Sequence, residues 1–203
     1  MSKKKEVTTE TQILEAAKHV FQNKGMDGAR MQEIADEAKI NKAMLHYYYR
    51  SKQLLFEAVF KNAFLLLAPQ LNKVLNDDSS IEDKIRNFTS NYISFINKHP
   101  YIPNFIIQEL NRNPNFISNI SEQAIFPNID KFKKQVEIEV QQGILKPIAA
   151  EQLFIHLLAL NVFPFIAKPL VKAFLHLEDK DFKQFMESRK KEVADFIIHS
   201  IKA

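Results

Sequence analysis

The chain has 203 residues, 46% of them hydrophobic and 26% charged, which is enough to bury a substantial core in one or two domains. The absence of cysteine excludes disulfides and thiolate metal sites and suits a reducing compartment. Residues 1–52 hold ten Lys and Arg against seven Asp and Glu, whereas residues 53–203 hold eighteen against seventeen. The longest wholly apolar run, residues 63–68, is far shorter than the ~20 residues that span a bilayer, so we expect a cytoplasmic protein without a membrane contact.

Apolar residues recur at spacings of three and four, strand-type alternation is absent, and only three glycines occur. This pattern predicts an all-α fold of about nine helices. The first predicted helix covers about residues 10–24, with Thr9 and Gln12 as a capping box and Gly25 as its end.

The next two predicted helices are short. One covers about residues 31–38, and the other follows Asn41, a good N-cap, and reaches about Tyr48. The connection between them is the tight Lys39-Ile40 pair. A tight turn after a helix commonly needs a left-handed residue, so we expect Lys39 to have positive φ.

Ser51 is expected to cap a long fourth helix. After the polar break at residues 76–79, Ser79 and Glu82 form a second predicted capping box, and His99-Pro100 ends the fifth helix.

Further predicted helices cover residues 103–111, residues 150–163 and residues 182–201. A helical region is also predicted from Pro114 to about Gln142, with Gly143 as its end. Pro164 and Pro169 are expected to kink or end the helix that begins near residue 150.

Residues 30–52 have the organisation of a helix-turn-helix, in which a short second helix reads base edges while flanking groups hold phosphates. The stretch from residue 38 to residue 56 contains four Lys or Arg and no acid, as expected of a phosphate-facing surface. Leu45 and Tyr48 are expected to point inward. The candidate DNA-binding residues are Arg30, Met31, Asn41, Lys42, Ala43, Met44, His46, Tyr47 and Lys52.

Five groups of residues in the region from 11 to 60 carry a family resemblance. They are Ile13-Leu14-Glu15-Ala16-Ala17 with Phe21 and Gly25, Ile34-Ala35-Asp36-Glu37-Ala38, Ile40-Asn41-Lys42 with Leu45, Tyr48-Tyr49-Arg50-Ser51-Lys52, and Leu54-Leu55. In this order and spacing they resemble the DNA-binding domain of the TetR family of bacterial transcriptional regulators.

The chain departs from that pattern at four positions. Lys39 stands where the family favours glycine, and Arg30 where it has a threonine. His46 replaces a common tyrosine and Tyr49 a common phenylalanine. These departures concern individual DNA contacts rather than the module.

The resemblance implies a DNA-binding domain at residues 1–52 and a helical ligand-binding and dimerisation domain at residues 53–203. The implied function is a ligand-responsive, homodimeric transcriptional repressor that a small, largely apolar or aromatic effector releases from double-stranded operator DNA. The alternative is a helical small-molecule-binding or sensor protein whose N-terminal helices make only protein contacts.

The resemblance also suggests residues for the second domain, where plain core packing is the alternative for each aromatic residue. Candidate effector contacts are Tyr92, Phe95, Phe105, Glu109, Phe116, Phe126, His156 and Phe163. Candidate dimer contacts are Leu153, Leu157, Leu160, Phe185, Val193, Phe196 and Ile197. No His-x-x-x-His, glycine-rich phosphate loop or Gly-x-Ser-x-Gly pattern occurs, so we expect neither an enzyme nor a cofactor or metal site.

Overall fold

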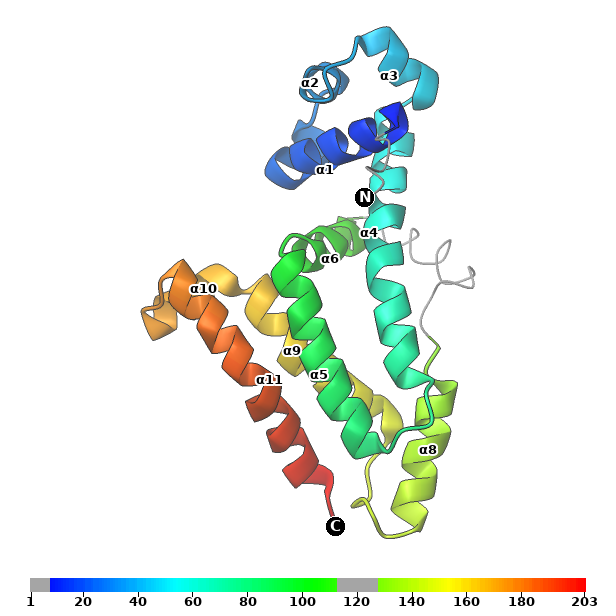
Figure 1. The fold of residues 1–203 in the computed structure, drawn as a ribbon, viewed down its shortest axis with the longest axis vertical. Helices are drawn as coiled ribbons and strands as arrows, with labels where there is room; N and C mark the ends of the chain where they lie inside the picture. The colour runs from blue at the N-terminus through cyan, green and yellow to red at the C-terminus, as the bar shows by residue number, and fades with distance from the viewer. Residues whose placement is uncertain (1–7, 113–127) are drawn as a thin grey trace, which may run out of the picture. The chain divides into compact units, whose positions relative to one another are not determined.

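The computed structural model describes residues 8–112 and 128–203, which form ten α-helices (Figure 1). The all-α prediction is therefore confirmed. Two compact units divide the chain, Met1–Phe64 and Leu65–Ala203, and they meet inside a long helix. The helices are α1 (Thr9–Gly28), α2 (Met31–Glu37), α3 (Lys42–Tyr48), α4 (Lys52–Leu75), α5 (Ile81–Lys98), α6 (Ile102–Arg112), α8 (Asp130–Gln141), α9 (Ala150–Ile166), α10 (Lys168–Leu175) and α11 (Asp179–Ile201).

The N-cap of helix α1 lies one residue earlier than predicted. The side chain of Thr8, not that of Thr9, accepts the backbone N–H of Thr11 at 3.3 Å. Gly25 interrupts the helix as predicted, with φ 66° and ψ 175°, and a short further turn carries α1 to Gly28. The buried residues of α1 recur at spacings of three and four and form one apolar stripe: Ile13, Ala16, Ala17, Val20 and Phe21.

The turn between α2 and α3 is a Schellman motif. The N–H of Lys39 donates to the carbonyl of Asp36 at 3.1 Å, and that of Ile40 donates to Ala35 at 3.0 Å. Lys39 has φ 56°, as the turn requires, so the predicted left-handed lysine is confirmed. Asn41 then caps α3, because its Oδ1 accepts the N–H of Met44 at 2.7 Å.

Helix α4 begins after Ser51, whose hydroxyl accepts the N–H of Leu54 at 3.2 Å as predicted. By length and composition α4 is apolar enough to cross a membrane, and so is the bent pair of α9 and α10. The apolar face of α4 nevertheless packs against other parts of the protein. Phe60 is fully buried, and the Phe56 ring lies 5.0 Å from that of Phe21 in α1. We therefore interpret α4 as a core helix.

The break before α5 contains a lysine that the sequence did not single out. Lys84 is fully buried, and its ammonium donates to the carbonyl of Val74 at 3.2 Å, to that of Asp77 at 2.7 Å and to the Asp77 carboxylate. It thus satisfies carbonyls at the end of α4. The predicted Ser79 capping box is wrong, because Ser80 is the N-cap, accepting the N–H of Asp83 at 3.1 Å.

The remaining helices of the second unit pack around α5 and α9, with α5 lying along α11 (Figure 1). Gly143 ends α8 with φ 71°, as predicted. Pro164 does not end α9, which continues to Ile166, and the helix α10 that follows was not predicted. Pro169 instead begins α10, where its missing N–H costs no hydrogen bond, and α9 and α10 meet at a bend of 78°.

Candidate nucleic-acid interface

Helix α3 presents most of its side chains to solvent. Of the residues expected on its reading face, Lys42, Ala43, Met44 and His46 are exposed, and Tyr47 has 84% of its surface exposed. Leu45 points inward as predicted and is fully buried. The prediction for Tyr48 is wrong, because it is 41% exposed and its ring meets that of Tyr47 edge-on, with 5.6 Å between ring centroids. Leu45 is therefore the one buried residue of α3, and the other side chains of this helix are exposed to solvent.

Four cations around α3 have no internal partner. The side chains of Arg30, Lys39, Lys42 and Arg50 are exposed and form no ion pair or hydrogen bond with any residue that the structure describes. The backbone N–H of Arg30 donates to the Glu33 carboxylate at 3.3 Å, which leaves the guanidinium outside the cap of α2. Unpaired cations beside exposed backbone N–H groups at a helix start form a surface suited to phosphates.

Lys52, predicted as a phosphate contact, has a different position. Its ammonium donates to the carbonyl of Asp27 at 3.2 Å and to that of Ala29 at 3.0 Å. It therefore ties the start of α4 to the segment between α1 and α2. One of its three donors stays available, but its main contacts are structural.

A second tie was not predicted. The hydroxyl of Tyr49 donates to the Glu10 carboxylate at 3.2 Å and joins the end of α3 to the start of α1. Burial, with the nearby negative charge of Glu10, raises the pKa of Tyr49 to about 12. The sequence showed that Tyr49 stands where the family commonly has phenylalanine. It did not show that the added hydroxyl bonds Glu10, which lies 39 residues away in the chain.

The predicted effector residues divide into three groups. Tyr92 and Phe105 are buried, whereas His156 is exposed and Phe163 is 56% exposed, so these last two face away from the core. Phe116, Phe126 and the side chain of Glu109 lie outside the described part. The cavity beside Tyr92 and Phe95, among the residues described, has only about 10 Å³, room for no more than a water molecule.

The predicted dimer residues also divide. Leu153, Leu157, Val193 and Ile197 are buried in the chain's own core, so they pack inside one subunit instead of meeting a partner. Phe196 is 66% exposed, and Leu160 and Phe185 are half-buried. The apolar residues that α9 does expose include Ile155 and Phe163. The periodicity located the apolar helices correctly but did not distinguish their two faces.

Two short helices joined by a tight turn, with an exposed second helix among unpaired cations, define a helix-turn-helix DNA-binding domain. Residues 13–59 match the family model described as "Bacterial regulatory proteins, tetR family".

The relatives that this chain is similar to are also named as helix-turn-helix transcriptional regulators. The chain is 21% identical to the "Probable HTH-type transcriptional regulator YttP" of Bacillus subtilis over 189 residues, 91% of each protein. It is 30% identical to the repressor NicS of Pseudomonas putida over 92 residues, 45% of this chain and 43% of NicS. A TetR-family transcriptional regulator from Haemophilus influenzae has the same fold, with a TM-score of 0.66, 16% identity and coverage of 96% of this chain and 97% of that one. Residues 13–59 are therefore similar to the DNA-binding domain of the TetR family, and the full-length relative in Bacillus subtilis is named as a transcriptional regulator.

Proposed function

We propose that the protein is a homodimeric repressor that binds operator DNA through α3 and releases it when a small apolar effector binds the second unit. The observation that carries the DNA-binding part is the exposure of α3, where Tyr47 is 84% exposed and Lys42 is exposed as well. An aromatic side chain held in solvent without a core role is suited to base edges, and the unpaired cations are suited to phosphates. NicS, to which this chain is similar over 92 residues, is named as a repressor.

We propose as base-reading residues Ala43, Met44, His46 and Tyr47, and we propose Lys42, in the first turn of α3, as a phosphate contact. Arg30 and Met31 at the start of α2 and Asn41 at the start of α3 are proposed to contact phosphates and sugars. The Asn41 amide remains free for this because only its oxygen is used by the cap. Arg50, which the sequence analysis did not select, joins this set because it is exposed and unpaired among the described residues. Lys52 is proposed to position the domain.

The dimer is proposed to form through the exposed faces of α9 and α11. Ile155, Phe163 and Phe196 are each more than half exposed in the single chain, and large exposed apolar side chains on neighbouring helices mark an interaction surface. A two-fold interface would cover these residues with their own copies and set the spacing of the two α3 helices at a multiple of about one DNA turn.

The effector site is proposed to include Tyr92. This residue is 5% exposed, and burial raises the pKa of its hydroxyl. No hydrogen bond joins that hydroxyl to any residue within 8–112 or 128–203. A hydroxyl with no partner among the described residues is suited to donate a hydrogen bond to a polar group of a ligand. Because the adjoining space is about 10 Å³, binding would require α4 and α5 to open around it.

The test is a mobility shift with DNA fragments from the genomic neighbourhood of the gene, at defined salt. A sequence-specific complex that competitor DNA does not remove is expected. A protein that binds small molecules but no fragment would instead be a helical sensor whose N-terminal helices contact protein. Addition of apolar and aromatic compounds to the complex then tests the effector, and release of DNA is expected. The proposed place of action is the cytoplasm, where the operator lies.

A further inference from the structure

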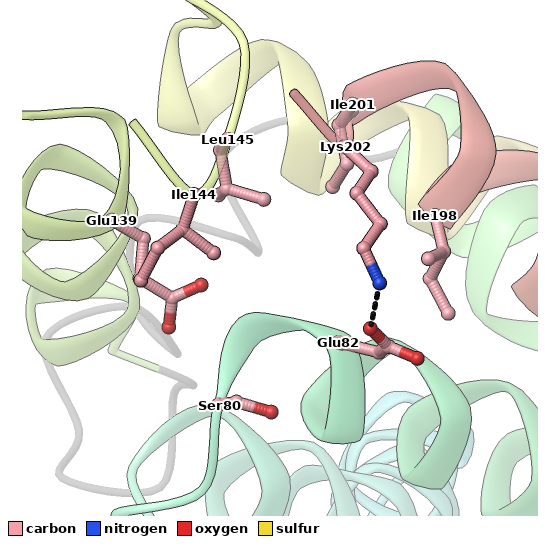
Figure 2. Close-up of a pocket in the computed structure, with 8 residues that line it drawn as sticks. All are labelled: Ser80, Glu82, Glu139, Ile144, Leu145, Ile198, Ile201 and Lys202. Carbon is pink, nitrogen blue, oxygen red and sulfur yellow. Dashed lines mark hydrogen bonds and ion pairs between the residues drawn. The ribbon is translucent and has the colours of Figure 1, made fainter. Parts of the chain in front are cut away.

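A second cavity lies in the second unit, lined by residues from the start of α5, the end of α8 with the loop after it, and the end of α11 (Figure 2). Its volume is about 130 Å³. This is comparable with an engineered cavity of about 150 Å³ that holds benzene. Ile144, Leu145, Ile198 and Ile201 give it apolar walls. The cavity therefore has the size and lining for one aromatic ring or a short branched alkyl group.

One buried carboxylate faces this space. Glu139 is 8% exposed, and Figure 2 shows its carboxylate directed toward the cavity. Its Oε1 accepts the N–H of Ile81 at 3.0 Å and the amide of Gln135 at 3.1 Å. Its Oε2 accepts no hydrogen bond from any residue in the described ranges. Both donors to Oε1 are neutral, and no ion pair joins the carboxylate to a cation within residues 8–112 or 128–203, so the cavity offers a vacant acceptor.

The other charged groups of the cavity are already engaged. Glu82 accepts from Arg86 at 3.1 Å and from Lys202 at 3.5 Å, and in Figure 2 Lys202 extends to Glu82 on the side away from Glu139. Arg86 and Lys202 thus offset the charge of Glu82, whereas Glu139 forms no ion pair with any residue that the structure describes.

The walls are held by backbone hydrogen bonds. The N–H of Lys146 donates to the carbonyl of Ile201 at 2.7 Å, and that of Ala203 donates to Ile144 at 3.2 Å, which fixes the loop after α8 against the end of α11. Because backbone bonds fix two of its walls, the cavity is preformed and a ligand loses little free energy in organising it.

We propose that this cavity binds a small primary amine with an apolar body, such as an arylmethyl or branched alkyl ammonium. The ammonium donates to the free Oε2 of Glu139, and the apolar body lies against the isoleucine and leucine side chains. A neutral molecule of the same shape lacks the charge, and an anion is repelled by Glu139. This site shares no residue with the proposed effector site at Tyr92, and it depends on neither DNA binding nor effector release.

The test measures binding of benzylamine, benzyl alcohol and benzoate to the full chain by calorimetry and thermal shift. One benzylamine is expected per chain, with at least tenfold preference over benzyl alcohol and no binding of benzoate. Glu139→Gln keeps an oxygen for the Ile81 N–H and removes the charge, so it should weaken benzylamine at least tenfold and leave benzyl alcohol within about twofold. Glu137→Gln, on the same helix but exposed, is the matched control and should change neither.

A second variant tests the cavity itself. Ile144 is 50% exposed, so Ile144→Phe is expected to fold and to fill the space, abolishing binding of both benzylamine and benzyl alcohol. The proposal is overturned if benzylamine does not bind the unmodified chain. It is also overturned if Glu137→Gln weakens binding as much as Glu139→Gln does, or if Ile144→Phe leaves binding intact. None of these results involves DNA, so the proposed repressor function would be unaffected.

Discussion

The two units of the chain use their surface cations differently. Around α3 in the first unit, Arg30, Lys39, Lys42 and Arg50 have no internal partner among the described residues. In the second unit the cations are extensively paired, and Arg86 bonds both Glu82 and Asp195. The other pairs there include Lys131–Asp78, Lys133–Glu151, Lys168–Asp179, Lys172–Asp179 and Lys190–Glu187.

This difference separates charge that serves the fold from charge that is available to a partner. The pairing is also visible in pKa values: hydrogen bonds from Lys168 and Lys172 lower the pKa of Asp179, and a hydrogen bond from Lys133 lowers that of Glu151. Exposed pairs of this kind add little stability, but each removes a positive charge from the outer field. The four cations near α3, which form no such pair among the described residues, keep their positive charge available. Local pairing therefore marks the DNA-facing surface better than the net charge of each unit does.

The largest expected effect comes from the second unit. Phe196→Lys places an ammonium on the proposed dimer surface, where burial without a partner is costly. We expect the dimer dissociation constant to rise at least 100-fold, about 2.7 kcal/mol, and operator affinity to fall with it. Sedimentation velocity at micromolar concentration measures the first and fluorescence anisotropy the second.

Because Phe196 is 66% exposed in the single chain, the variant should keep its helical circular dichroism. Ile138→Lys on α8, where Ile138 is 51% exposed, is the matched control and should remain dimeric. A dimer of unchanged affinity in the Phe196 variant would remove α11 from the interface.

Next in size is Tyr47→Ala. Its side chain is 84% exposed and supports no core, so its loss should leave the melting temperature unchanged. Operator affinity should fall by about 1–3 kcal/mol with a relaxed base preference, because a base-edge contact is removed. Anisotropy on the operator and on single-base variants of it measures both. Equal loss on all sequences would show that Tyr47 contacts only the backbone.

Lys52 and Lys42 sharpen the comparison within one unit. Lys52→Ala removes two charge-assisted bonds to Asp27 and Ala29, so we expect the first unit to lose roughly 1–3 kcal/mol of unfolding free energy. Lys42→Ala should leave stability within ±0.5 kcal/mol and reduce the salt slope of DNA binding by about one per subunit. Urea unfolding and salt titrations of both variants measure this contrast. The opposite assignment of the two effects would mean that Lys52 contacts the phosphate.

These contrasts show what the sequence reveals and what it leaves open. Caps and turns follow from neighbouring residues, so Asn41, Ser51 and Gly143 were predicted with their roles. Periodicity also located most of the helices, but it did not predict α10. Contacts between distant residues did not follow: the bonds from Lys52 to carbonyls more than twenty residues away and the burial of Lys84 depend on tertiary packing.

When a helix is apolar on two faces, the sequence likewise does not show which face lies in the core and which could contact a partner. In α9 almost every position is apolar, so Leu153 and Leu157 could be assigned to a partner surface as readily as Ile155 and Phe163. The packing of α5, α6, α8 and α11 against α9 decides which face is internal. The capping errors at Thr9 and Ser79 are smaller: each has a second hydroxyl residue beside it, and the true cap is that neighbour.

The smallest expected effect is at Lys39, where the left-handed conformation is now established. A lysine at φ 56° carries strain of about 1 kcal/mol that glycine would not. Lys39→Gly should therefore stabilise the first unit, although the added entropy of the unfolded chain offsets part of the gain. Whether the lysine is kept for DNA is a separate question, and its surroundings argue for a weak contribution: Lys39 lines an open hollow together with Glu15 and Glu37. These carboxylates oppose the field of its ammonium, so we expect Lys39→Gly to reduce the salt slope by clearly less than Lys42→Ala does. Urea unfolding and salt titration, with Lys42→Ala as the reference, measure both quantities. A slope reduced as much as in the Lys42 variant would show that the ammonium reaches a phosphate despite its acidic neighbours, and that the strained turn serves DNA binding.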